Sequence, residues 1–313
     1  MKKLNTMLVI FTALILMTTT VACKETRNGW QSNYATAKAL AEAQGKNIFL
    51  FVSGEDWDTY STNLRTTIFE TEEFMSEVEK DYVLVHLDFS NSRNEDQFMQ
   101  EDAQVAMDFN ATTMSLPAVI LITNDGYVFG TIDFDETVTT PNQYIEVLKT
   151  HNEKAKTVSE LLEKIEKAEG AKKAKLIDTL VETVPQSHRY LLTELAMTIP
   201  YIDPTNESGI IGKYQVQEAY SNAIQSIYMG DVQGAINALL APVDDGFLSS
   251  EEKQELYYQA AYFYSMQGEE TIPQVVEYLQ KAYDEAPDSE LSQNSIMETL
   301  EMYKQVISSE QES

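Results

Sequence analysis

Few side chains in this sequence could carry out chemistry, and their spacing excludes most familiar catalytic centres. The chain has one cysteine, Cys23, so no disulfide can form within it. The histidines, His86, His151 and His188, are scattered and lack partner cysteines or His-x-x-x-His spacing, so no zinc centre is expected. The sequence also lacks a P-loop, a Gly-x-Gly-x-x-Gly loop and a Ser-His-Asp elbow. We therefore expect no metal and no cofactor.

The remaining candidate for chemistry is an acidic turn at residues 54–61. A calcium loop of the EF-hand type that starts at Asp56 would need glycine at its sixth position and glutamate at its twelfth. This chain has Ser61 and Thr67 at those positions. Solvated acids that cap a helix are the expected interpretation, and a looser cation site is the alternative.

The first 22 residues have the pattern of a secretory signal peptide. Two lysines precede an apolar stretch over residues 7–17, which is too short to span a membrane, and small residues follow. Residues 20–23, Thr-Val-Ala-Cys, resemble the lipobox of bacterial lipoproteins, although leucine is usual at the first of these positions. The resemblance implies cleavage before Cys23, a diacylglyceryl group on its thiol and a tether over residues 23–29. The alternative is an ordinary signal peptide with an incidental cysteine.

The chain is strongly acidic and long enough for two domains. Its 22 Lys and Arg against 50 Asp and Glu give a net charge of −28, which becomes about −30 when Lys2 and Lys3 leave with the signal peptide. Nucleic-acid binding needs clustered cations that displace counterions, so nucleic acid is excluded as a partner. The same charge argues against adsorption to anionic lipid, so we expect membrane attachment through the lipid anchor alone.

Hydrophobic periodicity predicts the elements that position the acidic turn. Continuous apolar runs indicate buried strands, amphipathic stretches indicate helices, and an Asp-Gly pair at residues 125–126 indicates a hairpin. The expected order is helix 32–44, strand 47–52, helices 57–65 and 70–80, strand 82–88, helix 94–108, strands 117–123 and 127–133, and helix 140–152. Strands separated by helices predict a mixed, mostly parallel sheet. Only helices are expected from residue 154, so the predicted domains are 30–153 and 154–313.

The segments around the turn resemble the secreted thioredoxin-like proteins of bacteria. A Gly-x-x-Trp turn at residues 54–57 follows a buried strand, Phe69 and Phe74 are five residues apart, and a strand ends in Asp-Phe at residues 88–89. A strand led by Pro117 and the Asp-Gly hairpin follow in the order of that family. The resemblance covers about residues 29–152 and implies an α/β thioredoxin-like fold with a Cys-x-x-Cys redox motif directly after the tryptophan.

This chain departs from the family at the redox motif. Asp58 and Ser61 occupy the two cysteine positions, and Phe51 and Val52 stand where related redox proteins have a buried acid. Thiol–disulfide exchange needs an attacking thiolate and a resolving thiol, so we expect no dithiol oxidoreductase activity and no catalytic residue. The carboxylate of Asp58 is expected to cap the following helix.

Without the thiols, the groove of the fold remains as a candidate peptide site. The resemblance places a cis-proline, Pro117, beside the motif, with the backbone of Leu116 free to pair with an extended peptide. Trp57 and Tyr60 would complete this patch. The alternative is that these four residues are inherited scaffold.

The helical half carries a weak repeat that resembles tetratricopeptide units. Its small-residue and turn positions are Ala223, Gly230, Ala235, Ala261, Gly268 and Ala282. The two glycines are 38 residues apart, close to the repeat length of about 34. The pattern predicts a short α-solenoid whose concave surface binds a protein or peptide. The alternative is a set of helices that pack only on each other or on the first domain.

Together, these features predict a non-catalytic, lipid-anchored protein of the bacterial cell envelope, on its periplasmic or outer-surface side. We expect it to bind a protein partner as a scaffold or a chaperone-like holder. One alternative is an accessory or enzyme of envelope disulfide maturation that works with a thiol-bearing partner. Another is a surface component that has no partner.

Overall fold

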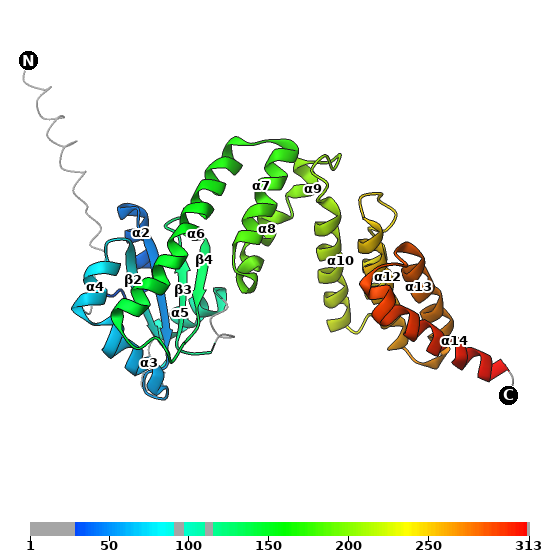
Figure 1. Ribbon diagram of the computed structural model, residues 1–313, viewed down its shortest axis with the longest axis horizontal. Helices are drawn as coiled ribbons and strands as arrows, with labels where there is room; N and C mark the ends of the chain where they lie inside the picture. Colours follow the sequence, from blue (N-terminus) through cyan, green and yellow to red (C-terminus); the bar gives the residue numbers. More distant parts are fainter. Residues whose placement is uncertain (1–28, 91–96, 110–114, 312–313) are drawn as a thin grey trace, which may run out of the picture. The chain divides into compact units, whose positions relative to one another are not determined.

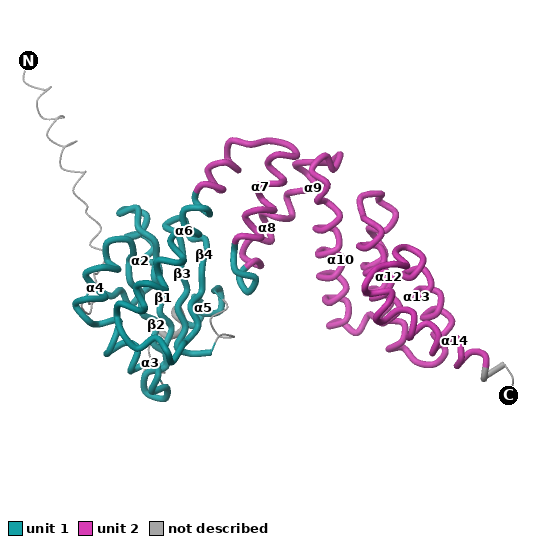
Figure 2. The backbone as a smooth tube through the Cα atoms, viewed as in Figure 1, with its two compact units in different colours: residues 1–159, 184–188 teal, residues 160–183, 189–313 magenta. Residues whose placement is uncertain are grey.

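The computed structural model describes residues 29–90, 97–109 and 115–311 (Figure 1). The chain divides into two compact units (Figure 2). Unit 1 contains Met1–Ser159 and Val184–His188, and unit 2 contains Glu160–Thr183 and Arg189–Ser313. The predicted signal peptide and the lipid site at Cys23 lie outside the described residues. Within the described ranges, no helix is long and apolar enough to cross a membrane.

Unit 1 is built on a four-stranded mixed sheet with the order β2-β1-β3-β4. The strands are β1 (Asn47–Ser53), β2 (Tyr82–Asp88), β3 (Ala118–Ile122) and β4 (Val128–Ile132). β1 is parallel to β2 and antiparallel to β3, and β3 is antiparallel to β4. All four strands were expected, the first three because each is a short, mostly apolar run and β4 because it follows the Asp-Gly hairpin signal.

The expectation of a mostly parallel sheet was wrong, since two of the three strand pairings are antiparallel. The register gives the reason. β2 ends at Asp88, which pairs with Ser53, and β3 begins at Ala118, which pairs with Val52. The connection that contains α5 (Gln97–Asp108) therefore starts and ends at the same edge of the sheet, and β3 runs back along β1. Alternation of strands and helices in a sequence does not distinguish this return from a parallel crossover.

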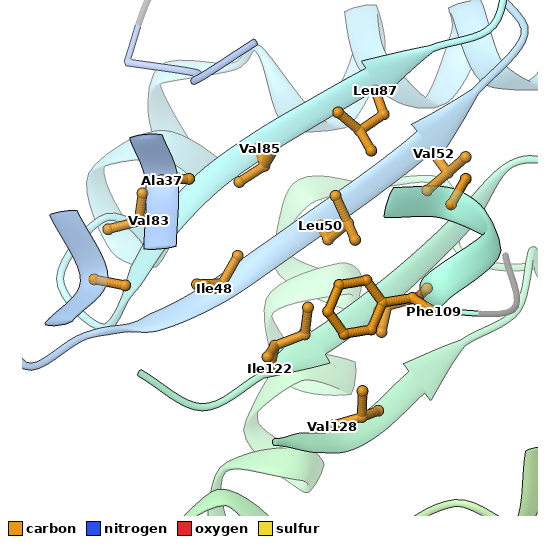
Figure 3. Close-up of a cluster of buried hydrophobic side chains, with 13 residues drawn as sticks. Ala37, Ile48, Leu50, Val52, Val83, Val85, Leu87, Phe109, Ile122 and Val128 are labelled. Carbon is orange, nitrogen blue, oxygen red and sulfur yellow. The ribbon is translucent and has the colours of Figure 1, made fainter. Parts of the chain in front are cut away.

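The two faces of the sheet bury different side chains. Aliphatic residues of β1 and β2, such as Leu50 and Val85, share one face with Ala37 of α2 (Tyr34–Gln44) and with Phe109 after α5 (Figure 3). The opposite face is aromatic and includes Phe49 of β1. β1 is therefore buried on both sides, as its continuous apolar run predicts.

The remaining helices of unit 1 cover the aromatic face and support the acidic turn. They are α3 (Thr59–Leu64), a π-helical turn (Arg65–Phe69), α4 (Glu72–Val78) and α6 (Pro141–Lys167). Phe69 and Phe74 pack with their rings 5.0 Å apart, and both lie close to Tyr144 of α6. α6 continues to Lys167 rather than ending at residue 152, since no glycine or proline interrupts the sequence before Gly170.

Unit 2 is mostly helical. Its helices after α6 are α7 (Gly170–Thr183), α8 (Thr193–Ala196), α9 (Ile199–Ile202), α10 (Ile211–Tyr228), α11 (Val232–Leu240), α12 (Ser250–Ser265), α13 (Ile272–Glu285) and α14 (Met297–Gln311). 3₁₀ turns cover Gln186–Leu192 and Glu269–Thr271, and a π-helical turn covers Ser292–Ile296. Two hydrophobic clusters hold the last five helices together, one centred on α10, α11 and α12 and the other on α12, α13 and α14.

The repeat-like positions lie at helix contacts and turns. Ala223 of α10 and Ala235 of α11 are buried in one cluster, and Ala261 of α12 and Ala282 of α13 are buried in the next. Gly230 and Gly268 lie between the helices of each pair with φ values of +77° and +117°, which favour glycine. These positions therefore allow close helix packing and tight turns.

Candidate functional site

The carboxylate at the first redox-motif position caps a helix. α3 begins at Thr59, and Asp58 is its N-cap. The two carboxylate oxygens of Asp58 accept the backbone N–H groups of Tyr60 at 3.1 Å and Ser61 at 3.0 Å. This confirms the cap expected from the sequence and directs the carboxylate toward the backbone of its own helix.

The hydroxyl at the second redox-motif position is buried and already paired. Ser61 has no exposed surface. Its Oγ donates a hydrogen bond to the Asp58 carboxylate and accepts one from the N–H of Gly54 at 3.3 Å. A serine acts as a nucleophile only where a substrate can reach it and a base can take its proton. Ser61 thus connects the turn to α3 and is not accessible for attack on a substrate.

Replacing Asp58 with alanine is expected to lower the free energy of unfolding of unit 1 by about 1–2 kcal/mol, because two N–H groups and the Ser61 hydroxyl lose their acceptor. Asp58→Asn keeps a capping oxygen and should cost less. Urea unfolding followed by tryptophan fluorescence reports on unit 1, since both tryptophans, Trp30 and Trp57, belong to it. Equal stability of Asp58→Ala and the wild type would contradict this role for the carboxylate.

Three aromatic side chains surround the capped turn, and we call Trp57, Tyr60 and Phe134 the aromatic rim. Trp57 is 54% exposed, and its Nε1 donates to the carbonyl of Phe89 at 3.1 Å. Tyr60 is 52% exposed, and its ring centroid lies 4.8 Å from that of Phe134. Large aromatic groups held at the surface in this way are typical of protein-binding sites.

A small apolar pocket of about 120 Å³ lies beside Pro117. Its lining residues are Leu64, Pro117, Val119, Ile132, Asp133, Phe134, Asp135, Val138, Tyr144 and Val147. They come from α3, β3, the end of β4 and α6, so the pocket opens at the edge of the sheet. The acids Asp133 and Asp135 are exposed beside a largely apolar wall. The pocket is therefore suited to one apolar side chain with positive charge nearby.

The structure brings only part of the expected patch together. The Leu116–Pro117 peptide bond is cis, and Pro117 lines the apolar pocket. Tyr60 reaches the pocket through its contact with Phe134. Trp57 and Leu116 are not lining residues, and Leu116 packs partly against the aliphatic core.

Sequence reasoning did not identify the segment after β4 as part of the site. Asp133, Phe134 and Asp135 follow the last strand, and the sequence alone marks them only as the end of a hairpin. A phenylalanine between two aspartates at a strand end is an unusual surface residue, and this was the available signal.

A polar network lies behind the acidic turn, where β1 and β2 end. The Nε2 atom of His86 is 2.7 Å from the Oγ of Ser53, and the ring of His86 stacks on Phe51 with centroids 4.8 Å apart. Asp88 accepts hydrogen bonds from the hydroxyl of Ser53 at 3.4 Å and from the N–H of Glu55 at 3.1 Å. Ser53 is completely buried, so no substrate reaches its hydroxyl. The network therefore joins the strand ends.

Arg65, which was not predicted from the sequence to be part of the site, also binds the acidic turn. Arg65 donates to Glu55 and, at 2.6 Å, to Glu70. The pKa of Glu55 is raised above its ordinary value, mainly because the side chain is partly buried; the negative charges of Asp88 and Glu70 add to this, and the hydrogen bond and charge of Arg65 oppose it. Glu55 is thus a paired, partly buried acid and not the solvated one expected. Across the described ranges, no three His, Cys, Asp or Glu side chains are arranged to hold a metal ion.

Comparisons with known families agree with the two-part organisation. Residues 29–123 match a family described as thioredoxin-like, and residues 210–310 match one described as an uncharacterised protein C-terminal domain. Unit 1 therefore contains a thioredoxin-like domain. A protein of Treponema pallidum (strain Nichols), described as uncharacterized, is 28% identical over 169 residues. That match spans 53% of this chain and 56% of the relative, so just over half of the relative's length is covered.

Two solved structures are distantly similar to the chain. One is described as a DsbH oxidoreductase, with 18% identity, a TM-score of 0.35 and coverage of 43% of this chain and 92% of that one. The other is a disulphide isomerase from Xylella fastidiosa Temecula1, with 18% identity, a TM-score of 0.23 and coverage of 31% and 68%. Similarity at this level carries no argument about activity.

Proposed function

We propose that this chain is a redox-inactive, thioredoxin-like lipoprotein of the bacterial cell envelope, on its periplasmic or outer-surface side. It binds extended segments of protein partners as a scaffold or chaperone-like holder. One observation carries the proposal. The two positions that hold thiols in redox-active relatives contain Asp58 and Ser61, which are hydrogen-bonded to each other in the same turn that exposes Trp57 and Tyr60.

The apolar pocket supports a preference for a particular kind of segment. Its wall accepts one aliphatic side chain, while Asp133 and Asp135 are exposed at its edge. A partner segment with an apolar residue next to lysine or arginine would complement both features. The exposed rings of Trp57 and Tyr60 would cover that segment and exclude water around it.

Unit 2 offers a second surface for partners, as a helical array of tetratricopeptide type would. The hydroxyl of Tyr220 on α10 donates to Glu255 on α12 at 2.9 Å, which fixes these two helices side by side. Ile224 and Tyr228, one and two turns beyond Tyr220, are exposed, as is Tyr262 of α12. Exposed tyrosine and isoleucine side chains on neighbouring helices support the proposal of a protein-binding surface.

Attachment to the membrane rests on Cys23. The sequence before it supports removal of the first 22 residues and lipidation of the new N-terminus. Mass spectrometry of the N-terminal peptide from native membranes tests this step. A peptide that begins at Cys23 with a diacylglyceryl mass supports the anchor, and an unmodified or uncleaved peptide contradicts it.

The redox part of the proposal predicts no turnover of disulfides. The soluble form without the lipid site, residues 24–313, is mixed with insulin and dithiothreitol, and the rate of disulfide reduction is measured. The expected rate equals that of dithiothreitol alone, because Asp58 and Ser61 supply no thiol. Catalysed reduction, oxidation or isomerisation of a disulfide by the pure chain would contradict the proposal.

If the chain binds extended peptides as proposed, the side chains of the aromatic rim should contribute to the affinity for the peptide. Two sets of short extended peptides carry a central leucine, which is flanked by lysine in one set and by glutamate in the other. Fluorescence anisotropy measures the binding of each set. The lysine set should bind better, and Trp57→Ala or Tyr60→Ala should weaken it by about tenfold. Tyr201→Ala is the matched control, since Tyr201 is 87% exposed and belongs to unit 2. Equal loss with Tyr201→Ala, or no preference between the sets, would count against the groove.

A further inference from the structure

A second pocket of unit 1 lies at the opposite end of β1 from Asp58. It has a volume of about 450 Å³ and is lined mainly by polar side chains where β1 and β2 begin. β1 runs from Asn47 at this pocket to Ser53 at the acidic turn, a separation of about 20 Å for a strand of this length. The pocket is therefore separate from the candidate peptide groove. We call it the lysine pocket.

The charged residues that line the lysine pocket are mostly positive, whereas the chain as a whole is acidic. Lys46, Lys80 and Lys156 line it together with a single acid, Asp81, although the chain as a whole has 22 basic and 50 acidic residues. Lys38 is not a lining residue, but its ammonium group lies beside the hairpin turn that carries Asn124, since a Cβ on Gly126 would be 3.6 Å from its Nζ. The lining of the pocket therefore has three positive charges and one negative charge, which favours anions.

Two of these four cations have no opposite charge to neutralise them. Lys38 and Lys156 form no ion pair with any residue that the structure describes, and Lys80 pairs only with the exposed Glu77 on its own helix turn. Lys46 donates one hydrogen bond, to the carbonyl of Glu79 at 2.7 Å, which leaves two N–H groups of its ammonium for a ligand.

Neutral donors complete the lining. Asn152 of α6 accepts a hydrogen bond on its Oδ1 from the buried hydroxyl of Tyr82 at 2.6 Å, so its remaining polar group is an NH₂ donor. Asn124 adds a second carboxamide from the hairpin turn. Several ammonium groups with amide donors match an anion that has more than one charge and several acceptor oxygens.

We propose that the lysine pocket binds a phosphate group. A phosphate monoester offers close to two negative charges near neutral pH and several strong acceptor oxygens, which the donors on Lys46, Lys156 and Asn152 complement. The phosphodiester in the headgroup of an anionic phospholipid carries one negative charge and two non-bridging oxygens. Both the soluble ester and the headgroup therefore present anionic phosphate oxygens to the same ammonium and amide donors.

The position of the N-terminal tether favours the headgroup. Gly29 lies directly beside the side chain of Glu79, since a Cβ on Gly29 would be 2.3 Å from it. The carbonyl of Glu79 accepts the hydrogen bond from Lys46. The chain therefore enters unit 1 at the end that carries the lysine pocket. Five residues separate Cys23 from Gly29, which is about 20 Å at full extension. This step rests on the proposed lipid at Cys23, whereas the phosphate site itself does not.

The experiment uses the unlipidated chain, residues 24–313, so that failure of the lipid proposal does not affect it. Isothermal titration measures binding of glycerol 3-phosphate, and vesicle flotation measures binding to phosphatidylcholine with or without phosphatidylglycerol. The test variant is Lys46→Gln/Lys156→Gln. The control is Lys164→Gln/Lys167→Gln, which changes the charge equally at exposed positions further along α6. Circular dichroism verifies that each variant is folded.

We expect the test variant to weaken phosphate binding at least about tenfold and the control to bind like the wild type. Binding of glycerol 3-phosphate alone assigns the pocket to a soluble ester. Binding of phosphatidylglycerol vesicles, with or without glycerol 3-phosphate, assigns it to a headgroup. Absence of binding to both probes, or equal binding by the two variants, overturns the proposal.

Discussion

Replacing Phe49 with alanine is expected to lower the free energy of unfolding of unit 1 by about 3–5 kcal/mol. Phe49 has no exposed surface and lies at the centre of the aromatic face. Its ring centroid is 5.2 Å from Phe69 and 5.8 Å from both Phe74 and Trp30. Alanine removes these contacts and leaves a cavity that the surrounding rings cannot fill without leaving their own contacts.

Urea unfolding measured by tryptophan fluorescence checks this value, because Trp30 is a direct neighbour of Phe49. Tyr60→Ala is the matched control. It removes an aromatic ring that is 52% exposed, so it should change stability by less than about 1 kcal/mol. A loss below about 1 kcal/mol for Phe49→Ala would show that the aromatic face does not hold the domain together.

The second large effect is expected in unit 2, at Gln254 of α12. This side chain is 2% exposed, and its Nε2 lies 2.9 Å from the carbonyl oxygens of Ala282 and Ala286 and 2.8 Å from the Oγ of Ser292. Its Oε1 accepts the hydroxyl of Ser289 at 2.6 Å. Gln254→Ala removes all of these contacts from a buried position and takes this donor from the carbonyl of Ala282, whereas Ser292 still donates to the carbonyl of Ala286 at 2.8 Å. A loss of about 2–3 kcal/mol is therefore expected.

Hydrogen exchange followed by mass spectrometry measures this loss directly in peptides from α12 and α13. Gln233→Ala is the matched control, because the side chain of Gln233 makes one exposed hydrogen bond, to Asn237 at 3.1 Å. The control should leave exchange unchanged within about 0.5 kcal/mol. Similar exchange in both variants would mean that Gln254 does not join the end of α13 to α12.

β1, β2 and β3 of unit 1 were predictable because each is a short, mostly apolar run, and β4 was predictable because it follows the Asp-Gly hairpin signal. The predicted strand over residues 82–88 has the observed bounds, and the other three differ by one residue at an end or at both ends. A strand that is buried on both faces has few polar residues, so its ends can be recognised in the sequence where the apolar run stops. The helix expected over residues 32–44 ends before Gly45 as predicted, but it begins two residues later, at Tyr34, because the side chain of Asn33 caps it.

Other features depend on contacts between distant residues and have no local signal. The direction of β3 is set by where its connection returns to the sheet, and no pattern within residues 89–117 encodes that return. The apolar pocket forms where Leu64, Pro117 and Phe134 meet, although they are up to 70 residues apart in sequence. The cap by Asp58 was predictable because its partners follow within three residues.

If the aromatic rim holds protein partners without thiol chemistry, their capture needs the two exposed rings and no free thiol. Partners are captured from a native envelope extract after every free thiol has been alkylated, with the soluble form of residues 24–313 as bait. Wild type, Trp57→Ala/Tyr60→Ala and the Tyr201→Ala control are compared. Alkylation should leave the captured partners unchanged, and the Trp57→Ala/Tyr60→Ala variant should lose those held by the rim, whereas partners of unit 2 stay bound. Capture that alkylation abolishes, or a set of partners that is the same with and without both rings, would show that the rim does not act in this way.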